Sequence, residues 1–464
     1  MRTTLTGYEA PVTGEPSYPS RPRNAHALAG VGVHSYTESQ SKSLIQTGEV
    51  AAMTMTDIGA RIERARAAAD LSQRALAGAT GLSQSSLSRI ISGARPPKMP
   101  ELVAIAWETG HTVAQLIGTG VSAERAQCAA RATNDSDMDG MRRALLDFLE
   151  LDEYLDDQAI PATTGSRAGK QGPETVNAEQ EGRTEAERFR REQNLGMQPL
   201  GDLVAIIEQA AGIDVAVLDA DQDEHGLTMR APERGAVFIA VARTEHPMRQ
   251  RSTLAHELGH VLFEDWVNSD TGGWSNRSPG ESRANAFARH LLVPVEGLRA
   301  FLGERGSIGR SDLSAVVQRF LVSPKIASIA LHQAGYIDLS TKKEWMALFA
   351  PGLATRFGWS DQYLALRDDS ARRRAPQQLL TRAIKGYAEG ILSVQAIATL
   401  RGLSRGDTEV ELGKAGVVPA DRSAMWADHS ELPEPDVDLS ALDEALDAPD
   451  EDTEAPDTTA SDSG

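Results

Sequence analysis

The stretch His256-Glu257-Leu258-Gly259-His260 determines how the rest of this chain is interpreted. Residues four apart on a helix share a face, so both imidazoles can reach one metal ion. Glu257 follows the first histidine and lies close enough to act on a water molecule beside that ion. Gly259 costs a helix about 1 kcal/mol relative to alanine, which indicates close packing of another backbone there. The pentapeptide therefore predicts a metal site on a helix.

A third ligand is needed, because a catalytic zinc usually takes three protein ligands. A run rich in Gly, Ser and Asn spans 268–280, and an amphipathic helix follows it, ended by Pro294. Glu281 lies in its first turn, where the helix dipole favours the ionised carboxylate that binds metal. Asn285, one turn later, is placed to hydrogen-bond a ligating histidine. We therefore predict a Zn²⁺ site with ligands His256, His260 and Glu281, catalytic residue Glu257 and supporting residue Asn285.

The two segments together resemble the ImmA/IrrE family of metallo-endopeptidases. The resemblance is carried by Thr-Leu-Ala-His-Glu-Leu-Gly-His at 253–260 and by Glu-x-x-Ala-Asn-x-Phe-Ala-x-x-Leu-Leu-Val-Pro at 281–294. The resemblance covers about 200–337 and implies a gluzincin-like metal site. It also implies either proteolysis of a transcriptional repressor or a role in a stress-response switch. Glu257 would take a proton from water and pass it to the leaving amine. A buried or edge strand predicted at Ala236–Val241 would align an extended peptide by edge pairing.

Two other interpretations of the motif stay open. The pentapeptide can belong to an ordinary helix without metal, or the zinc can be structural in a domain that has no peptidase activity. His246 and His290 flank the motif, and we assign them no function.

A second module lies between Ile58 and Leu116. Ser72 and Ser83 are good N-caps for two short helices, which are predicted at 73–80 and 84–92 and are separated by a three-residue turn. Helices at 58–69, 100–106 and 112–116 complete a compact helical module. This arrangement is typical of a helix-turn-helix.

The module resembles the Cro/phage-repressor (XRE-like) DNA-binding family, from Leu71-Ser72-Gln73 to Leu87-Ser88-Arg89-Ile90. The resemblance implies contacts to double-stranded operator DNA from Gln73, Gln84, Ser85, Ser86 and Arg89. Residues 57–118 hold seven Lys/Arg and five Asp/Glu, so attraction to phosphates is modest and a homodimer is expected. The alternative is a helical module that serves protein contacts only.

Composition limits the environment of the protein. The formal charge is −19, but residues 431–464 hold 13 acidic residues and no Lys or Arg, so the rest of the chain carries −6. The single cysteine, Cys128, excludes an internal disulfide and favours a reducing cytoplasm. The sequence shows no apolar run of transmembrane length and no signal peptide, so no membrane association is expected.

The predicted fold is multidomain: an all-α helix-turn-helix domain, an α+β gluzincin-like metallopeptidase domain, a helical C-terminal extension and disordered termini. A helix capped by Ser323-Pro324 hints at a second helix-turn-helix, although packing over the active site is the preferred interpretation. The predicted parts are a disordered extension (1–56), the helix-turn-helix (57–118), a helical extension (119–155), a linker (156–185), the peptidase domain (186–340), a helical region (341–425) and an acidic disordered tail (426–464).

These features predict a DNA-binding transcriptional regulator with a zinc endopeptidase domain that cleaves a helix-turn-helix repressor or antitoxin-like protein. One alternative is a non-proteolytic transcription factor whose zinc domain senses a ligand or partner. Another is a peptidase whose helix-turn-helix only docks onto a similar domain of its substrate. The presence of Glu257 favours the first, since a structural site has no need of it.

Overall fold

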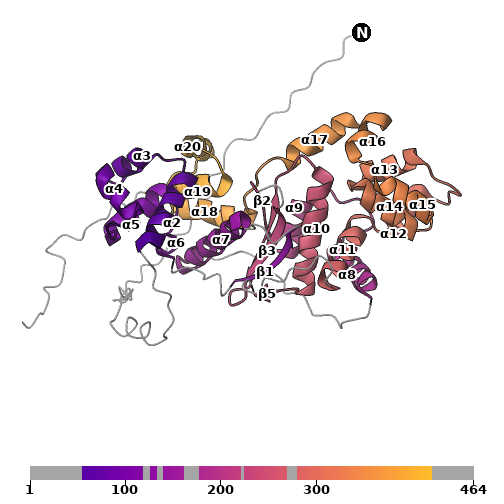
Figure 1. Cartoon of the computed structure of the whole chain (residues 1–464), viewed down its shortest axis with the longest axis horizontal. Coiled ribbons are helices and arrows are strands. Elements are labelled where there is room, and N and C mark those ends of the chain that lie inside the picture. The colour runs from indigo at the N-terminus through magenta and orange to yellow at the C-terminus, as the bar shows by residue number, and fades with distance from the viewer. Residues whose placement is uncertain are drawn as a thin grey trace, which may run out of the picture. The chain divides into compact units, whose positions relative to one another are not determined.

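The computed structural model describes residues 55–118, 126–132, 139–160, 177–220, 224–268 and 279–420 (Figure 1). Residues 1–54 of the predicted disordered extension (1–56), the whole predicted acidic tail (426–464) and most of the predicted linker lie outside these ranges, while residues 55–56 begin the first described helix. None of the described helices is long and apolar enough to cross a membrane.

The helix-turn-helix module forms as predicted. Ser72 and Ser83 cap their helices by accepting hydrogen bonds from the backbone N–H groups of Ala75 and Ser86. Each cap satisfies a donor that the first helical turn leaves unpaired. One face of every helix contributes to a small apolar core that includes Ile62, Leu76, Leu87, Ile90, Ile105 and Leu116. The helices are α2 (Met55–Ala68), α3 (Gln73–Ala79), α4 (Gln84–Ile91), α5 (Met99–Thr109) and α6 (Val113–Ile117).

A five-stranded mixed sheet forms the second part, with strand order β2-β4-β3-β1-β5. β2 and β4 are parallel, and the other neighbouring strands are antiparallel. Our prediction that the strand near 236–241 offers a free edge to a peptide is wrong, because β4 is hydrogen-bonded to β2 on one side and to β3 on the other. The strands are β1 (Gln127–Ala132), β2 (Asp214–Leu218), β3 (Glu224–Ala231), β4 (Ala236–Ala242) and β5 (Val267–Asn268).

Helices cover both faces of this sheet. Alternate residues of β4 belong to different cores: Ile239 and Val241 pack with α10, while Phe238 and Ala240 pack with α7 and α18. This is the two-residue period of a strand that is buried on both faces. The helices on the α10 side are α8 (Ala178–Glu192), α9 (Leu203–Ala211), α10 (Pro247–Phe263) and α11 (Pro279–Leu292), and α7 (Asp139–Asp157) lies on the other side.

Two segments that were predicted to lie outside the peptidase domain pack against its sheet or its helices. α8 begins inside the predicted linker and packs along α11. β1 and α7, predicted as a helical extension of the DNA-binding module, contribute a strand and a covering helix to the sheet. α7 also contacts α6, where the Gln115 side chain donates to the carbonyl of Asp147 (3.1 Å).

The C-terminal helices belong to both cores. α13 and α14 pack in the α10 core, so the helix capped by Ser323 lies in the core of the peptidase-like part. α18 is held on the sheet by Asp214, whose carboxylate accepts from the backbone N–H groups of Gln378 (2.8 Å) and Leu379 (3.0 Å). The helices are α12 (Val295–Leu302), α13 (Arg310–Phe320), α14 (Pro324–Gln333), α15 (Leu339–Met346), α16 (Ala350–Phe357), α17 (Ser360–Ser370), α18 (Gln377–Ala388), α19 (Val394–Arg401) and α20 (Arg405–Lys414).

Candidate metal centre

Helix α10 carries the pentapeptide between the sheet and α11. Pro247 occupies its first position, where a missing N–H costs nothing. Every residue from Thr253 to Leu262 is buried, because the helix is covered by β3 and β4 on one side and α11 on the other. The expected close packing at Gly259 is confirmed: a Cβ there would lie 3.2 Å from the Cα of Ala284 on α11. This close approach brings the start of α11 to the histidines.

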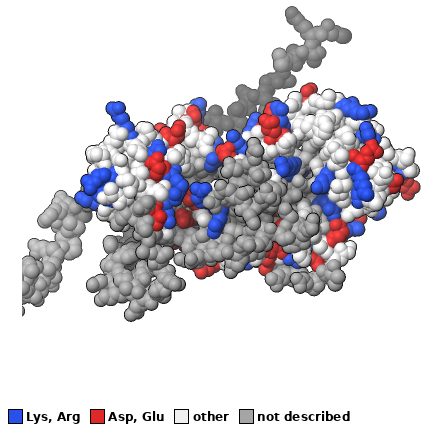
Figure 2. Space-filling view, viewed as in Figure 1, with Lys and Arg blue, Asp and Glu red and all other residues white. Residues whose placement is uncertain are grey.

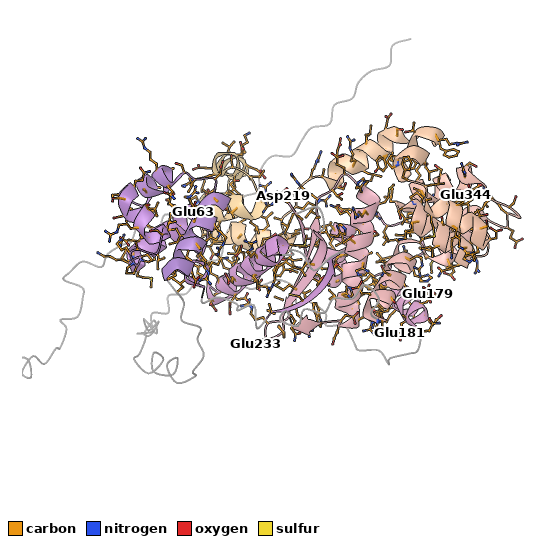
Figure 3. All side chains as sticks on the ribbon, viewed as in Figure 1. Glu63, Glu179, Glu181, Asp219, Glu233 and Glu344 are labelled. Atoms are coloured by element: carbon orange, nitrogen blue, oxygen red, sulfur yellow. The ribbon has the colours of Figure 1, made fainter. Side chains whose placement is uncertain are left out.

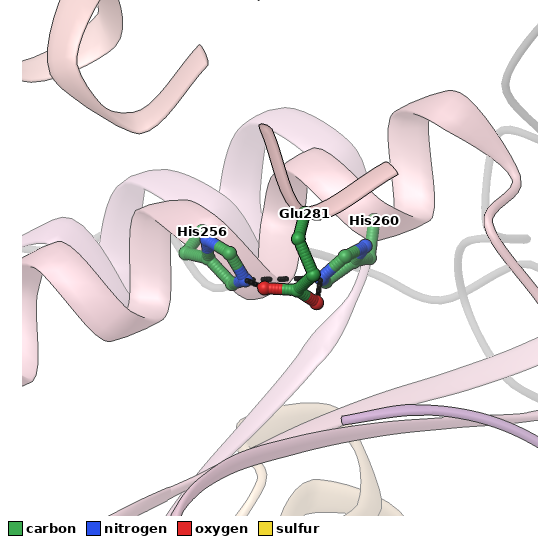
Figure 4. Close-up of side chains that lie close together, drawn as sticks. All are labelled: His256, His260 and Glu281. Carbon is green, nitrogen blue, oxygen red and sulfur yellow. Dashed lines mark hydrogen bonds and ion pairs between the residues drawn. The ribbon is translucent and has the colours of Figure 1, made fainter. Parts of the chain in front are cut away.

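The two predicted histidines and the predicted glutamate converge on one point (Figure 4). The Nε2 atoms of His256 and His260 lie 3.0 Å apart. The Glu281 carboxylate reaches both rings, with Oε2 3.3 Å from His256 Nε2 and Oε1 3.0 Å from His260 Nε2. Three side chains thus direct one ligand atom each to a common centre.

This arrangement fits a zinc ion. Zinc–ligand bonds of 2.0–2.1 Å in a tetrahedron place neighbouring ligand atoms about 3.3 Å apart, close to the separations seen here. Two imidazole nitrogens and a carboxylate oxygen are also the donor types that catalytic zinc prefers, and three ligands leave a fourth position for water. His256, His260 and Glu281 would hold the ion.

The electrostatics of the site favour a positive charge. Burial acts to lower the pKa of His260, but the carboxylates of Asp265, Glu281 and Glu257 outweigh it and raise the pKa to about 10. Burial acts to raise the pKa of Glu281, which the two histidines nevertheless hold well below its usual range. Carboxylates gathered around buried imidazoles make this centre electrostatically suited to a cation.

Asp265 contacts the ring nitrogen of His260 that faces away from the proposed metal position. Its Oδ2 lies 3.2 Å from Nδ1 of His260, and its carboxylate also pairs with Arg283 of α11. A carboxylate on the far nitrogen of a ligating imidazole orients the ring and fixes its tautomer. We predicted this support from Asn285, but its side-chain amide donates to the backbone carbonyl of Glu281 (2.7 Å).

Glu257 lies beside the ligands, on the side of α10 that faces β3. It is fully buried, and its Oε2 accepts a hydrogen bond from the hydroxyl of Thr228 (2.9 Å) on β3. Gly226, two residues earlier on the same strand, leaves room for it, since a Cβ there would lie 2.9 Å from Glu257 Oε1. Strand β3 therefore forms the surface against which the carboxylate is held.

The two flanking histidines lie outside the ligand set. His290 lies on α11 with Nε2 2.8 Å from Glu179 of α8, a residue labelled in Figure 3. His246 is exposed at the start of α10. Neither belongs to the cluster that can hold a metal among the described residues.

The predicted DNA-contacting residues lie on α3 and α4 and are exposed or partly exposed. Gln84, Ser85 and Arg89 are exposed on α4, and Ser86 is partly exposed. Gln73 starts α3, with its amide nitrogen 3.5 Å from the carboxylate of Glu63 on α2. Basic and acidic side chains are interspersed on the face shown in Figure 2. This is consistent with the small excess of basic over acidic residues in 57–118.

Two further residues that hold the site, Asp265 and Thr228, were not predicted from the sequence. Asp265 follows Glu264, whose left-handed backbone (φ 54°) ends α10 and turns the chain back toward His260. An acidic pair directly after the helix was the available signal. Thr228 gave no signal, because a threonine in a strand is common whatever lies across from it.

The comparisons with known proteins identify both domains. Residues 57–107 match the model of a helix-turn-helix domain, and residues 208–332 match the model of a peptidase family described as an IrrE N-terminal-like domain. The chain therefore combines a DNA-binding helix-turn-helix with a peptidase-like domain of the IrrE type. Both predicted resemblances and the predicted fold class are confirmed.

The similar solved structures add little. They include apo ComR from S. thermophilus (13% identity, covering 78% of this chain and 92% of that chain, TM-score 0.14). They also include PlcR from Bacillus thuringiensis in complex with the peptide PapR7 and DNA (12% identity, 78% and 93% coverage, TM-score 0.15). At such TM-scores the likeness supports no conclusion about this chain. No curated protein matches it.

Proposed function

We propose that the protein is a transcriptional regulator whose IrrE-like domain is a zinc-dependent endopeptidase that cleaves a repressor or antitoxin-like protein and thereby derepresses genes. The observation that carries this proposal is the convergence of His256, His260 and Glu281 beside the buried carboxylate of Glu257. A structural zinc site has no use for a further acidic group that lies beside the three ligands.

The chain's own residues supply positioning and proton transfer. When bound, zinc supplies Lewis acidity, which polarises the scissile carbonyl and brings the pKa of water near neutrality. Glu257 takes the proton from the attacking water and delivers it to the leaving amine. Thr228 holds the Glu257 carboxylate in place, and Asp265 holds the ring of His260.

Cleavage of a candidate repressor tests this function. The wild-type protein and the Glu257→Gln variant are each co-expressed, in medium that contains zinc, with any small helix-turn-helix repressor that a neighbouring gene encodes. We expect fragments of the repressor with the wild type alone, and no fragments when purified wild type is treated with a chelator. An intact repressor in every sample contradicts the proposal and favours a non-proteolytic regulator.

The non-proteolytic alternative is favoured by one observation. His256 and Glu257 have no exposed surface, as expected of a site that is not open to a peptide. In this alternative the metal domain senses a ligand or partner and changes DNA binding without hydrolysis.

Thr228 is a positioning residue for Glu257, and its replacement should lower turnover. Thr228→Val keeps the shape but removes the hydroxyl, which leaves a buried carboxylate oxygen without this donor. We expect kcat to fall by about 10- to 100-fold, as when a supporting hydrogen bond is lost at a metal site, with KM and zinc content unchanged. Thr228→Ser retains the donor and should recover most of the rate. Equal losses in both variants would show that only packing is affected.

For the DNA-binding domain, we propose that Gln84, Ser85, Ser86 and Arg89 of α4 contact bases of an operator and that Gln73 contacts its edge. The exposure of the α4 residues supports this. The mild charge excess of residues 57–118 favours binding as a homodimer, since one copy neutralises few phosphates. Tethering to DNA would raise the local concentration of the peptidase near a promoter-bound substrate.

Arg89 should contribute most to operator recognition. Arginine pairs with guanine through two hydrogen bonds, so Arg89→Ala should weaken operator binding by about 5- to 150-fold, equivalent to 1–3 kcal/mol. Lys343→Ala, which removes an exposed cation from α15, is the matched control and should bind like the wild type. Titration of labelled operator at fixed salt measures both. Unchanged binding of Arg89→Ala would exclude it from the interface.

A further inference from the structure

The edge of β3 is occupied by a strand from elsewhere in the chain. β1 lies before α7 in sequence and outside the matched peptidase-like region 208–332. It nevertheless pairs antiparallel with β3 over its whole length, on the side opposite β4. β1 and β3 are labelled next to each other in Figure 1. Within residues 208–332, β3 would be an edge strand, and β1 covers that edge.

The covered edge borders the metal centre. Thr228, which donates to Glu257, pairs in register with Ala129 of β1, and Gly226, which makes room for Glu257, pairs with Arg131. Neighbouring strands lie about 4.8 Å apart, so the β1 backbone runs one strand spacing from the residues that touch the proposed base. β1 also contacts α10 itself. An extended peptide bound here would need the backbone N–H and C=O groups of β3 that β1 now uses.

The metal centre is closed in this state. Thr228, His256 and Glu257 each have 0% exposed surface. A peptide bond must come within contact distance of the base to be cleaved, so a substrate has to displace part of the structure. Among the described elements, β1 is the one that takes the place of a pairing peptide.

Several features of β1 weaken its pairing with the rest of the sheet. Its sequence, Gln-Cys-Ala-Ala-Arg-Ala, contains no β-branched or aromatic residue, and alanine is depleted in strands. The register shifts between Arg131 and Ala132, and on its other side β1 pairs with β5 through only Gln127 and Cys128. A side-chain hydrogen bond from Arg230 to Gln127 (2.8 Å) adds to the backbone pairing.

We propose that β1 is an internal pseudo-substrate strand that holds the peptidase-like site in an autoinhibited state. The proposal rests on the proposed peptidase function. The strand competes in cis with an extended segment of the protein substrate for the edge of β3. Catalysis then requires that the substrate, or a change in the neighbouring domain, moves residues 127–132 off that edge.

Prolines in β1 test the proposal in the full-length protein. The double substitution Ala129→Pro/Ala130→Pro removes the backbone N–H groups of both residues. Successive N–H groups of a strand point to opposite sides, so one of these two groups points to β3. Hydrogen exchange of the β3 amides and cleavage of the repressor are both measured. We expect roughly tenfold faster exchange and roughly tenfold faster cleavage. Ala129→Ser/Ala130→Ser keeps both N–H groups and serves as the matched control with wild-type behaviour.

Added peptide provides a test that is independent of catalysis. A blocked peptide of residues 127–132, with serine in place of Cys128, is added to the proline variant at about 1 mM, the order of concentration that a short tether provides. We expect it to restore protection to the β3 amides and to slow cleavage, whereas a peptide of scrambled sequence does neither.

Several outcomes decide between the proposals. Failure of the peptide to protect β3, or cleavage by the proline variant no faster than by its serine control, overturns the autoinhibitory role. If the proline variant melts at a clearly lower temperature, Gln127→Ala replaces it, and cleavage no faster than wild type then overturns the role equally. If the peptide protects β3 but no variant cleaves the repressor, β1 still occupies the edge of β3, and the proposed peptidase function is wrong.

Discussion

The Glu257→Gln protein is expected to bind zinc as the wild type does and to lose cleavage of its substrate by about 10²–10⁴-fold. Glutamine has nearly the same shape, and its carbonyl oxygen still accepts from Thr228, so the fold around the site is retained. It has no group that can take a proton from water near neutral pH. The loss therefore falls on kcat rather than on substrate binding.

The measurement compares initial rates of repressor cleavage with the metal content of the same samples. Glu245→Gln makes the same substitution at an exposed position just before α10 and should leave both quantities unchanged. A Glu257→Gln protein that produces the same fragments at the wild-type rate would exclude Glu257 from proton transfer.

Removal of the third ligand should have the largest effect on the metal itself. Glu281→Ala leaves only the two imidazoles of α10 and removes the negative charge that lies 3.0–3.3 Å from them. Loss of a supporting group costs about 10- to 100-fold in affinity, so loss of a direct ligand should cost more than about 100-fold. We expect the purified variant to contain little zinc and to show no cleavage.

A graded series makes this prediction specific. Asp265→Asn weakens the support of His260 and should reduce zinc affinity by about 10- to 100-fold, less than Glu281→Ala does. Glu304→Ala, at an exposed position after α12, should change nothing. Competition with a metal-binding dye gives the affinities. Wild-type zinc affinity in Glu281→Ala would show that the metal is held elsewhere.

Much of the metal centre could be predicted because its information is local. The spacing of His256 and His260 requires only a helix, and the position of Glu281 in a first helical turn follows from the pattern of α11. The same is true of the DNA-binding module, where Ser72 and Ser83 cap helices through hydrogen bonds that span three residues. Contacts of this kind depend on the identity of residues close together in the chain.

The sheet could not be predicted in the same way. An apolar run such as 236–241 fits both a central and an edge strand, and the choice depends on which strands pair with it. The partners of β4 are β3, which precedes it by a short turn, and β2, which lies one strand further back. The other partner of β3 is β1, which lies more than 100 residues before β4. The alanine-rich sequence of β1 carries no strand signal of its own, so its place depends on its partners, above all β3.

The sequence by itself determined the proposed ligand set, the proposed base, the two capped helices of the DNA-binding module and the class of each domain. Each of these depends on helical periodicity or on capping, which act over a few residues. The tertiary structure decided that Thr228 and Asp265 hold the site, that β4 is central and that β1 covers the edge beside Glu257. These features depend on pairing and packing between distant segments, whose free energy comes from the partner rather than from the segment itself.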